Sequence, residues 1–231
     1  MTDDSDTAMM LAKRRPAMRR GGRPTAADAQ RRQAYLIEIA GAMFMRFGFD
    51  GTSVDAVAEA ASMSKRTVYA RYKDKGELFS AVLRDLIERW LVPITRFQSS
   101  DAALEPMLLE IARHLLTSAL APQAVSLHRI IIGEAERRPE FGRLAHSEGR
   151  QAGIRAIAAA LKRHHAQLRS DDLEQTAEQF MSLVIDSSLR LAALGITPRS
   201  RDIEGRIRAA VDLFLNGARR PNPRLARPWV K

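Results

Sequence analysis

The 231-residue sequence predicts an all-α fold. Apolar residues recur at three- and four-residue intervals through most of the chain, which is the period of a helix with one buried face. Glycines and prolines separate these periodic stretches. No stretch shows the sustained alternation of a half-buried strand. We therefore expect successive helices joined by short turns.

The first helix is predicted from residue 25 to about Phe47. Thr25, followed three residues later by Asp28, has the pattern of a capping box, in which each side chain accepts from the other residue's backbone N–H. Gly48 is placed to end the helix in a left-handed conformation, which costs glycine little.

Two short helices follow around a turn. We expect Thr52 to cap a helix that ends near residue 61, and Ser64 to cap another that ends near Tyr72. A longer helix begins after Asp74 and is kinked or ended by Pro93. The short–turn–short arrangement is that of a helix-turn-helix.

Five more helices are predicted in the rest of the chain, over residues 102–120, 123–137, 140–165, 171–194 and 200–216. Asp101 and Asp171 are the expected N-caps of the first and fourth of these. Gly149 and Gly153 are candidate interruptions of the third.

The net charge of +10 is unevenly distributed. Residues 13–75 carry fourteen Lys and Arg against six Asp and Glu, residues 76–216 carry eighteen of each, and the last fifteen residues carry five bases and no acid. A solvated basic face is the alternative interpretation of such an excess. Because the central excess coincides with the helix-turn-helix, we favour a polyanionic partner.

The second short helix would have one apolar and one cationic face. Val68 and Tyr72 lie four residues apart and can face inward, which leaves Lys65, Arg66 and Arg71 on the surface. In a major groove, Arg can donate bidentately to guanine, and Lys and Tyr can donate to phosphate oxygens. The pattern therefore predicts binding to duplex DNA.

Residues 32–83 resemble the TetR family of bacterial transcriptional regulators. The shared features are an aromatic-rich first helix, a glycine turn, an alanine-rich second helix, and a Ser-Lys-Tyr-Lys series before a Leu-Phe pair. They are carried here by Phe44, Gly48, Phe49, Thr52, Ser53, Val54, Ala58, Ala60, Ala61, Ser64, Lys65, Tyr69, Tyr72, Lys75, Leu78 and Phe79. The resemblance implies a DNA site in which Thr52, Ser53, Tyr69 and Lys75 touch phosphates and the bases are contacted from among Lys65, Arg66, Thr67, Ala70 and Arg71.

Two arginines depart from the family pattern. Arg66 stands where the family often has glycine, and Arg71 where it often has histidine or tyrosine. Long cations at these positions suggest guanine contacts. In the basic N-terminal arm, Arg20 and Arg23 flank two glycines and could enter a minor groove; a disordered solubilising arm is the alternative.

The helices after residue 90 look like the ligand-binding and dimerisation domain of the same family. Their last two helices would pair with a second copy, because two half-sites need two readers; ordinary core helices of a monomer are the alternative. The expected homodimer interface contains Phe180, Val184, Ser187, Leu191, Ile207, Val211 and Phe214.

Residues 127–134 and 139–141 resemble the C-terminal domain of AefR-like members of the family. The resemblance implies a cavity for a small, largely apolar effector, although an apolar stripe is more often plain core. The candidate pocket residues are Trp90, Phe97, Met107, Ile111, His114, Leu115, His128, Ile131, Phe141 and Met181.

Other functions have little support in the sequence. There is no cysteine, and the five histidines form no ligand set or catalytic constellation, so we expect no metal, no cofactor and no enzyme activity. Neither a secretory signal nor a membrane span is evident, which favours a cytoplasmic, nucleoid-associated protein.

The sequence as a whole predicts four parts. They are a basic arm (1–24), a three-helix helix-turn-helix DNA-binding domain (25–90), an effector-binding and dimerisation domain (91–217) and a basic tail (218–231). We expect a ligand-responsive repressor that binds a palindromic operator as a dimer. A transcriptional activator of the same family and a nonspecific architectural DNA-binding protein are the alternatives.

Overall fold

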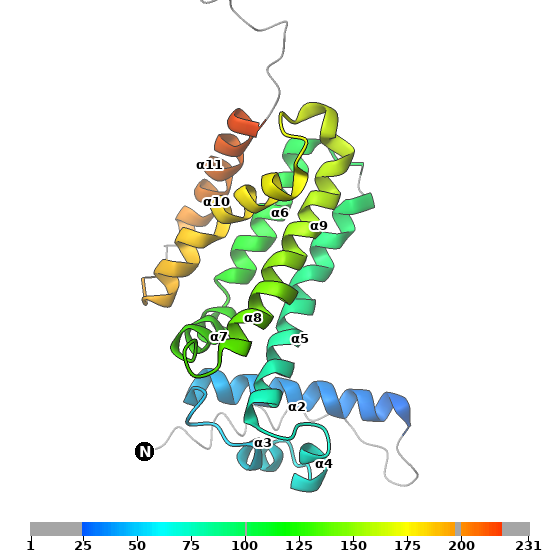
Figure 1. Cartoon of the computed structure of the whole chain (residues 1–231), viewed down its shortest axis with the longest axis vertical. Coiled ribbons are helices and arrows are strands. Elements are labelled where there is room, and N and C mark those ends of the chain that lie inside the picture. Colours follow the sequence, from blue (N-terminus) through cyan, green and yellow to red (C-terminus); the bar gives the residue numbers. More distant parts are fainter. Residues whose placement is uncertain (1–24, 100, 197–199, 219–231) are drawn as a thin grey trace, which may run out of the picture. The chain divides into compact units, whose positions relative to one another are not determined.

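A computed structural model describes residues 25–99, 101–196 and 200–218, and none of these residues lies in a β-strand. The all-α prediction is confirmed. The described chain divides into two compact units (Figure 1): one contains the residues up to Leu86 together with Arg129–Phe141, and the other contains Ile87–His128 and the residues from Gly142 onward. The predicted arm with Arg20 and Arg23, and the tail beyond residue 218, lie outside the described residues.

The first unit is built on α2 (Ala26–Phe47), α3 (Val54–Ala60), α4 (Lys65–Tyr69) and the start of α5 (Lys75–Thr95). The capping box at Thr25 and Asp28 is present, with the Thr25 hydroxyl accepting from the Asp28 N–H at 3.2 Å. Gly48 ends α2 with a φ of 71°. One face of each helix is buried, through Leu36, Ile39, Ala40, Phe44, Val57, Ala58, Val68, Leu78, Phe79 and Val82.

A later part of the chain completes this unit. Residues 129–141 include the end of α7 (Pro122–Gly133) and the start of α8 (Pro139–Leu144). The fully buried ring of Phe141 lies 4.5 Å from that of Phe79 and 5.3 Å from that of Phe49, measured between centroids. The guanidinium of Arg138 lies 4.6 Å from the Phe49 ring centroid. The two compact units are therefore not separated by the single boundary near residue 90 that the sequence predicts.

The second unit packs helices around one apolar core. After α5 and a 3₁₀ turn, η1 (Arg96–Ser99), come α6 (Leu104–Ala119), a π-helical turn η2 (Ala145–Arg150), α9 (Gln151–Leu161), a 3₁₀ turn η3 (Lys162–Gln167), α10 (Leu173–Ala193) and α11 (Ser200–Ala218). Helix α10 packs against α9, α6 and α11, and α11 also packs against α6 (Figure 1).

Several helix ends differ from the sequence prediction by a residue or two. Pro93 lies inside α5, which continues for two residues beyond it. Ala103, and not Asp101, is the N-cap of α6, and the Asp101 carboxylate accepts from Arg163. Asp172, and not Asp171, caps α10, accepting from the Gln175 N–H at 2.9 Å. Local sequence offers two adjacent carboxylates, Asp171 and Asp172, and the Asp171 carboxylate lies 3.1 Å from Nε2 of the His165 ring instead.

Candidate nucleic-acid interface

The turn between α2 and α3 places the candidate residues Thr52 and Ser53. Thr52 is 2% exposed and its hydroxyl donates to the Gly48 carbonyl at 2.8 Å, so it neither caps α3 nor presents a hydroxyl to a phosphate. The N-cap is Ser53, which is exposed and accepts from the Ala56 N–H at 3.1 Å. The prediction that Thr52 is the cap is therefore wrong by one residue.

Helix α4 is held by its N-cap and by an inward-facing pair. The Ser64 side chain accepts from the Thr67 N–H at 3.1 Å, and the two hydroxyls lie 2.7 Å apart. Val68 is fully buried and Tyr72 is 9% exposed, as the spacing predicts. The helix ends at Tyr69, three residues earlier than expected, with Ala70 as its C-cap. Lys65, Arg66, Thr67 and Ala70 are all exposed on it.

The turn that joins α3 to α4 contains a strained residue. Ser62 has a φ of 53°, in the left-handed region where glycine is favoured. A side chain there costs roughly 1 to 2 kcal/mol relative to a relaxed backbone.

An acidic residue that the sequence analysis missed organises one side of the interface. Asp55 on α3 lies 2.5 Å from the Lys65 ammonium, and the Tyr69 hydroxyl also donates to it. The bond from Lys65 lowers the pKa of Asp55, and the same bond raises the pKa of Lys65. The bond to Asp55 also raises the pKa of Tyr69. Asp55 therefore holds the Lys65 ammonium and the Tyr69 hydroxyl on one side of the interface.

The two unusual arginines have different surroundings. Arg66 is exposed and its guanidinium makes no hydrogen bond or ion pair with any described residue. Arg71 follows the end of α4, and its guanidinium donates to the side-chain carbonyl of Gln33 on α2. The Gln33 amide in turn donates to the Tyr72 hydroxyl. Nothing in the local sequence marked Gln33, which is 38 residues from Arg71 along the chain.

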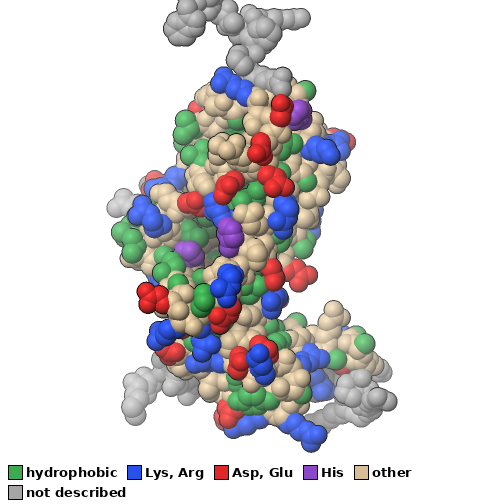
Figure 2. Space-filling view, viewed as in Figure 1, with side chains coloured by type: hydrophobic (Ala, Val, Ile, Leu, Met, Phe, Trp, Pro, Cys, Tyr) green, Lys and Arg blue, Asp and Glu red, His purple; other side chains and the backbone are tan. Residues whose placement is uncertain are grey.

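Lys75, the first residue of α5, is the last candidate residue of the DNA-binding surface along the chain. Its ammonium donates to the Asp50 carbonyl at 3.2 Å and lies 4.6 Å from the Phe49 ring centroid. Figure 2 shows Lys and Arg side chains on the visible surface around α3 and α4. The arrangement combines cationic and hydroxyl donors on short, capped helices, which suits phosphate oxygens and base edges.

The structure brings together most, but not all, of the candidate pocket residues. Met107, Ile111, Leu115 and Met181 are buried in the core of the second unit, and Trp90 and Phe97 pack against it. The His114 ring lies at the same place, with Nε2 2.8 Å from the Trp90 carbonyl. His128 is partly buried in this unit, and burial lowers its pKa. Ile131 and Phe141 belong to the other unit, where Phe141 packs against Phe49 and Phe79, so they do not join the set.

Most of the candidate dimer residues point into the core of their own subunit and not outward. Phe180, Val184, Ile207, Val211 and Phe214 lie in the unit's own core, and the Phe180 and Phe214 rings are 4.9 Å apart. The apolar stripe of α10 and α11 has the predicted helical period, but it packs within the subunit. The exposed side of α10 and α11 carries Ser187 and two large apolar side chains, Leu183 (40% exposed) and Leu213 (63%). Leu191, the remaining candidate, is half-buried, and Leu194 (67% exposed) is the C-cap of α10.

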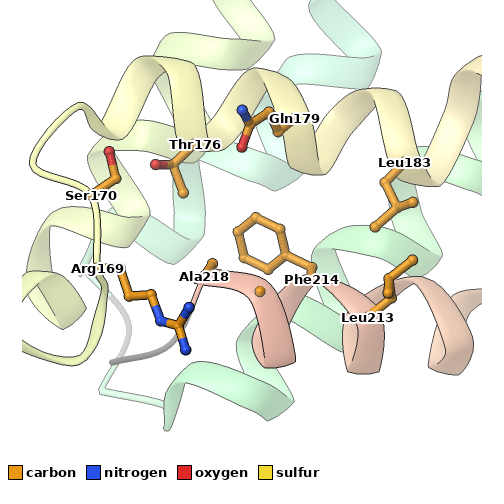
Figure 3. A pocket seen from close by; sticks show the side chains of 9 residues that line it. Arg169, Ser170, Thr176, Gln179, Leu183, Leu213, Phe214 and Ala218 are labelled. Atoms are coloured by element: carbon orange, nitrogen blue, oxygen red, sulfur yellow. The ribbon is translucent and has the colours of Figure 1, made fainter. Parts of the chain in front are cut away.

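Figure 3 shows a shallow hollow at this side, with Phe214 between α10 and α11.

Among the residues that the structure describes, no group of His, Cys, Asp and Glu could hold a metal ion. No single described helix is long and apolar enough to cross a membrane, although the bent pair α6 and α7 passes that test by length and composition.

Two family models match the chain. The model for bacterial regulatory proteins of the tetR family matches residues 36–82, and the model for the C-terminal domain of AefR-like transcriptional repressors matches residues 106–217. Among curated proteins, the chain is 32% identical over 111 residues to the HTH-type transcriptional regulator RutR of Escherichia coli. That match covers 48% of this chain and only about half, 52%, of the relative.

Solved structures match over more of the chain. The flavonoid-responsive regulator FrrA is 32% identical with a TM-score of 0.68, and the match covers 84% of this chain and all of that one. A structure described as a TetR-family transcriptional regulator from Mesorhizobium loti is 25% identical with a TM-score of 0.76, covering 83% of this chain and 98% of that one.

Proposed function

Because the chain belongs to the TetR family of DNA-binding transcriptional regulators, we propose that it is a ligand-responsive repressor that binds a palindromic operator as a homodimer. It is a regulator and not an enzyme. The observation that carries the proposal is the exposed donor surface of α4, held in place by the buried Val68 and Tyr72. The match to a repressor C-terminal domain favours repression over activation.

The DNA contacts are divided by position. In helix-turn-helix proteins, the N-terminal residues of the second helix reach the base edges, and flanking groups contact the backbone. Lys65, Arg66, Thr67 and Ala70 are the base-facing candidates on this surface, with Arg66 the one long cation there that has no partner among the described residues. Ser53, Ser64, Tyr69, Arg71 and Lys75 are the phosphate-facing candidates.

The homodimer uses the exposed side of α10 and α11. Leu183 and Leu213 are large apolar side chains on neighbouring helices that the subunit itself leaves in solvent. A self-complementary apolar patch on two helices suits a two-fold interface. Of the residues predicted from the sequence, Ser187 lies in this interface. The buried ones, such as Phe180 and Phe214, pack in the core below it.

The effector site lies in the second unit, near Trp90. A Cβ atom added at Gly153 would lie 2.5 Å from the Trp90 ring and 2.8 Å from the Met181 methyl group, so these side chains pack tightly against the Gly153 backbone and an effector would have to displace them. An aromatic ring, a thioether and the surrounding aliphatic core favour a largely apolar ligand. The similarity to a regulator described as flavonoid-responsive supports a flat aromatic ligand class.

Selection of bound sites from random duplex DNA tests the operator, and sedimentation of the purified protein tests the dimer. A palindromic consensus with a dimeric mass is expected. Aromatic compounds are then screened by quenching of Trp90 fluorescence in a Trp229→Phe background, and the hits are added to the operator complex. A ligand that tightens operator binding, or a consensus without two-fold symmetry, contradicts the proposal.

A further inference from the structure

We propose that Gln33 is a positioning residue that holds Arg71 for contact with a DNA phosphate. The proposal rests on the DNA-binding surface assigned above. It starts from the hydrogen bonds that link Gln33 on α2 to both Arg71 and Tyr72. These bonds join α2 to residues 38 and 39 positions later in the chain, just after α4.

The chemistry of the three side chains allows one orientation of the Gln33 amide. A guanidinium has only donors, so it must face the side-chain carbonyl oxygen. The NH₂ group then points to the Tyr72 hydroxyl, which accepts from it. A flipped amide would set N–H groups against the N–H groups of Arg71. Since Tyr72 is only 9% exposed and sits in the core, the amide is anchored to a fixed point.

The anchored amide restrains a side chain that would otherwise be free. Arg71 is exposed, and the bond to Gln33 is the only one that its guanidinium makes with a described residue. That bond uses a small part of its donor capacity and leaves the other N–H groups for a ligand. An arginine restrained before binding loses less conformational freedom when it meets DNA.

The position of Arg71 favours a phosphate as its partner. It follows the C-cap Ala70, outside the exposed turns of α4, and it is bound to α2. Arg66 lies within α4 with no such restraint. The two arginines are therefore expected to differ, with Arg66 selecting sequence and Arg71 contributing to affinity on any duplex.

Binding of the full-length protein to its selected operator and to a random duplex of equal length, at several salt concentrations, tests this. We expect Arg71→Ala to weaken both complexes and to reduce the salt slope by about one. Gln33→Leu should weaken both by about 2- to 12-fold, the cost of ordering one long side chain, and leave the slope unchanged. In an Arg71→Ala background, Gln33→Leu should have no further effect.

Gln30→Leu is the matched control, because Gln30 is exposed on the same helix and its side chain makes no hydrogen bond with a described residue. Tyr72→Phe, which releases the amide without touching Arg71, should weaken both complexes less than Gln33→Leu does. Equal losses from Gln33→Leu with and without Arg71 overturn the proposal, as does a loss confined to the operator. If the wild type selects no operator, the random-duplex measurements still test Gln33, so failure of the proposed function is seen separately.

Discussion

Replacing Phe141 by alanine should destabilise the DNA-binding unit, although residue 141 lies far from that unit's helices in sequence. Removing a fully buried phenylalanine ring typically costs about 3 to 5 kcal/mol. Two ring pairs are lost here, with Phe79 at 4.5 Å and Phe49 at 5.3 Å. Each such pair contributes about 0.5 to 1.5 kcal/mol beyond its buried area. The expected loss is a large part of the ~5 to 15 kcal/mol that stabilises a typical domain.

Hydrogen exchange measured by mass spectrometry resolves where this loss falls. In Phe141→Ala, the free energy of opening of amides in α2 and the start of α5 should fall by about 3 to 5 kcal/mol, or these amides should lose all protection. Amides of α10 should keep their protection. Phe141→Leu keeps most of the buried volume and loses the ring pairs, so it should cost about 1 to 3 kcal/mol.

Phe97→Ala is the control in the other unit, because Phe97 packs against the core that contains α6 and α10. It should lower protection in α10 and spare α2. If Phe141→Ala exposes α10 and leaves α2 unchanged, residues 129–141 do not stabilise the DNA-binding unit, and the assignment is refuted.

Three further changes test other features. Ser62→Gly should stabilise the protein by up to about 1 kcal/mol, measured by urea denaturation, because glycine relieves the positive φ; a loss of stability would contradict the strain. Burial lowers the pKa of His128, so the unfolded chain binds more protons and stability should fall as pH falls below about 6.5. His128→Gln should flatten that part of the pH–stability curve. An unchanged slope would show that the buried imidazole of His128 is not the source of the pH dependence. Arg66→Ala should relax specificity by ~1 to 3 kcal/mol while leaving random-duplex affinity nearly unchanged, and equal losses on both duplexes would assign Arg66 to phosphate.

Features governed by near neighbours in sequence were predicted well. The capping box of α2, the Ser64 cap and the buried pair Val68 and Tyr72 each depend on residues three or four positions apart. The choice of Ser53 over Thr52 as cap was missed, because both carry a hydroxyl and only the turn at Gly48 decides which is buried.

Features governed by distant residues were not predictable from the pattern. The apolar stripe of α10 was identified, but periodicity does not reveal whether a stripe packs against the same subunit or another one. The pattern therefore predicts a dimer contact for Phe180 and Phe214, whereas the structure packs the two rings against each other. Gln33 has no local signal at all, since its role depends on residues 38 and 39 positions away.

The contribution of residues 129–141 to the DNA-binding unit limits how this regulator can be recombined with its relatives. A chimera that exchanges only residues up to 86 or 90 would place a foreign Phe49 and Phe79 against a native Phe141 and Arg138. The donor's own counterpart of the 129–141 segment would have to be transferred as well. The smallest portable DNA-binding module of this protein is thus discontinuous in sequence, and a hybrid built from one cut would be expected to misfold or to lose operator binding.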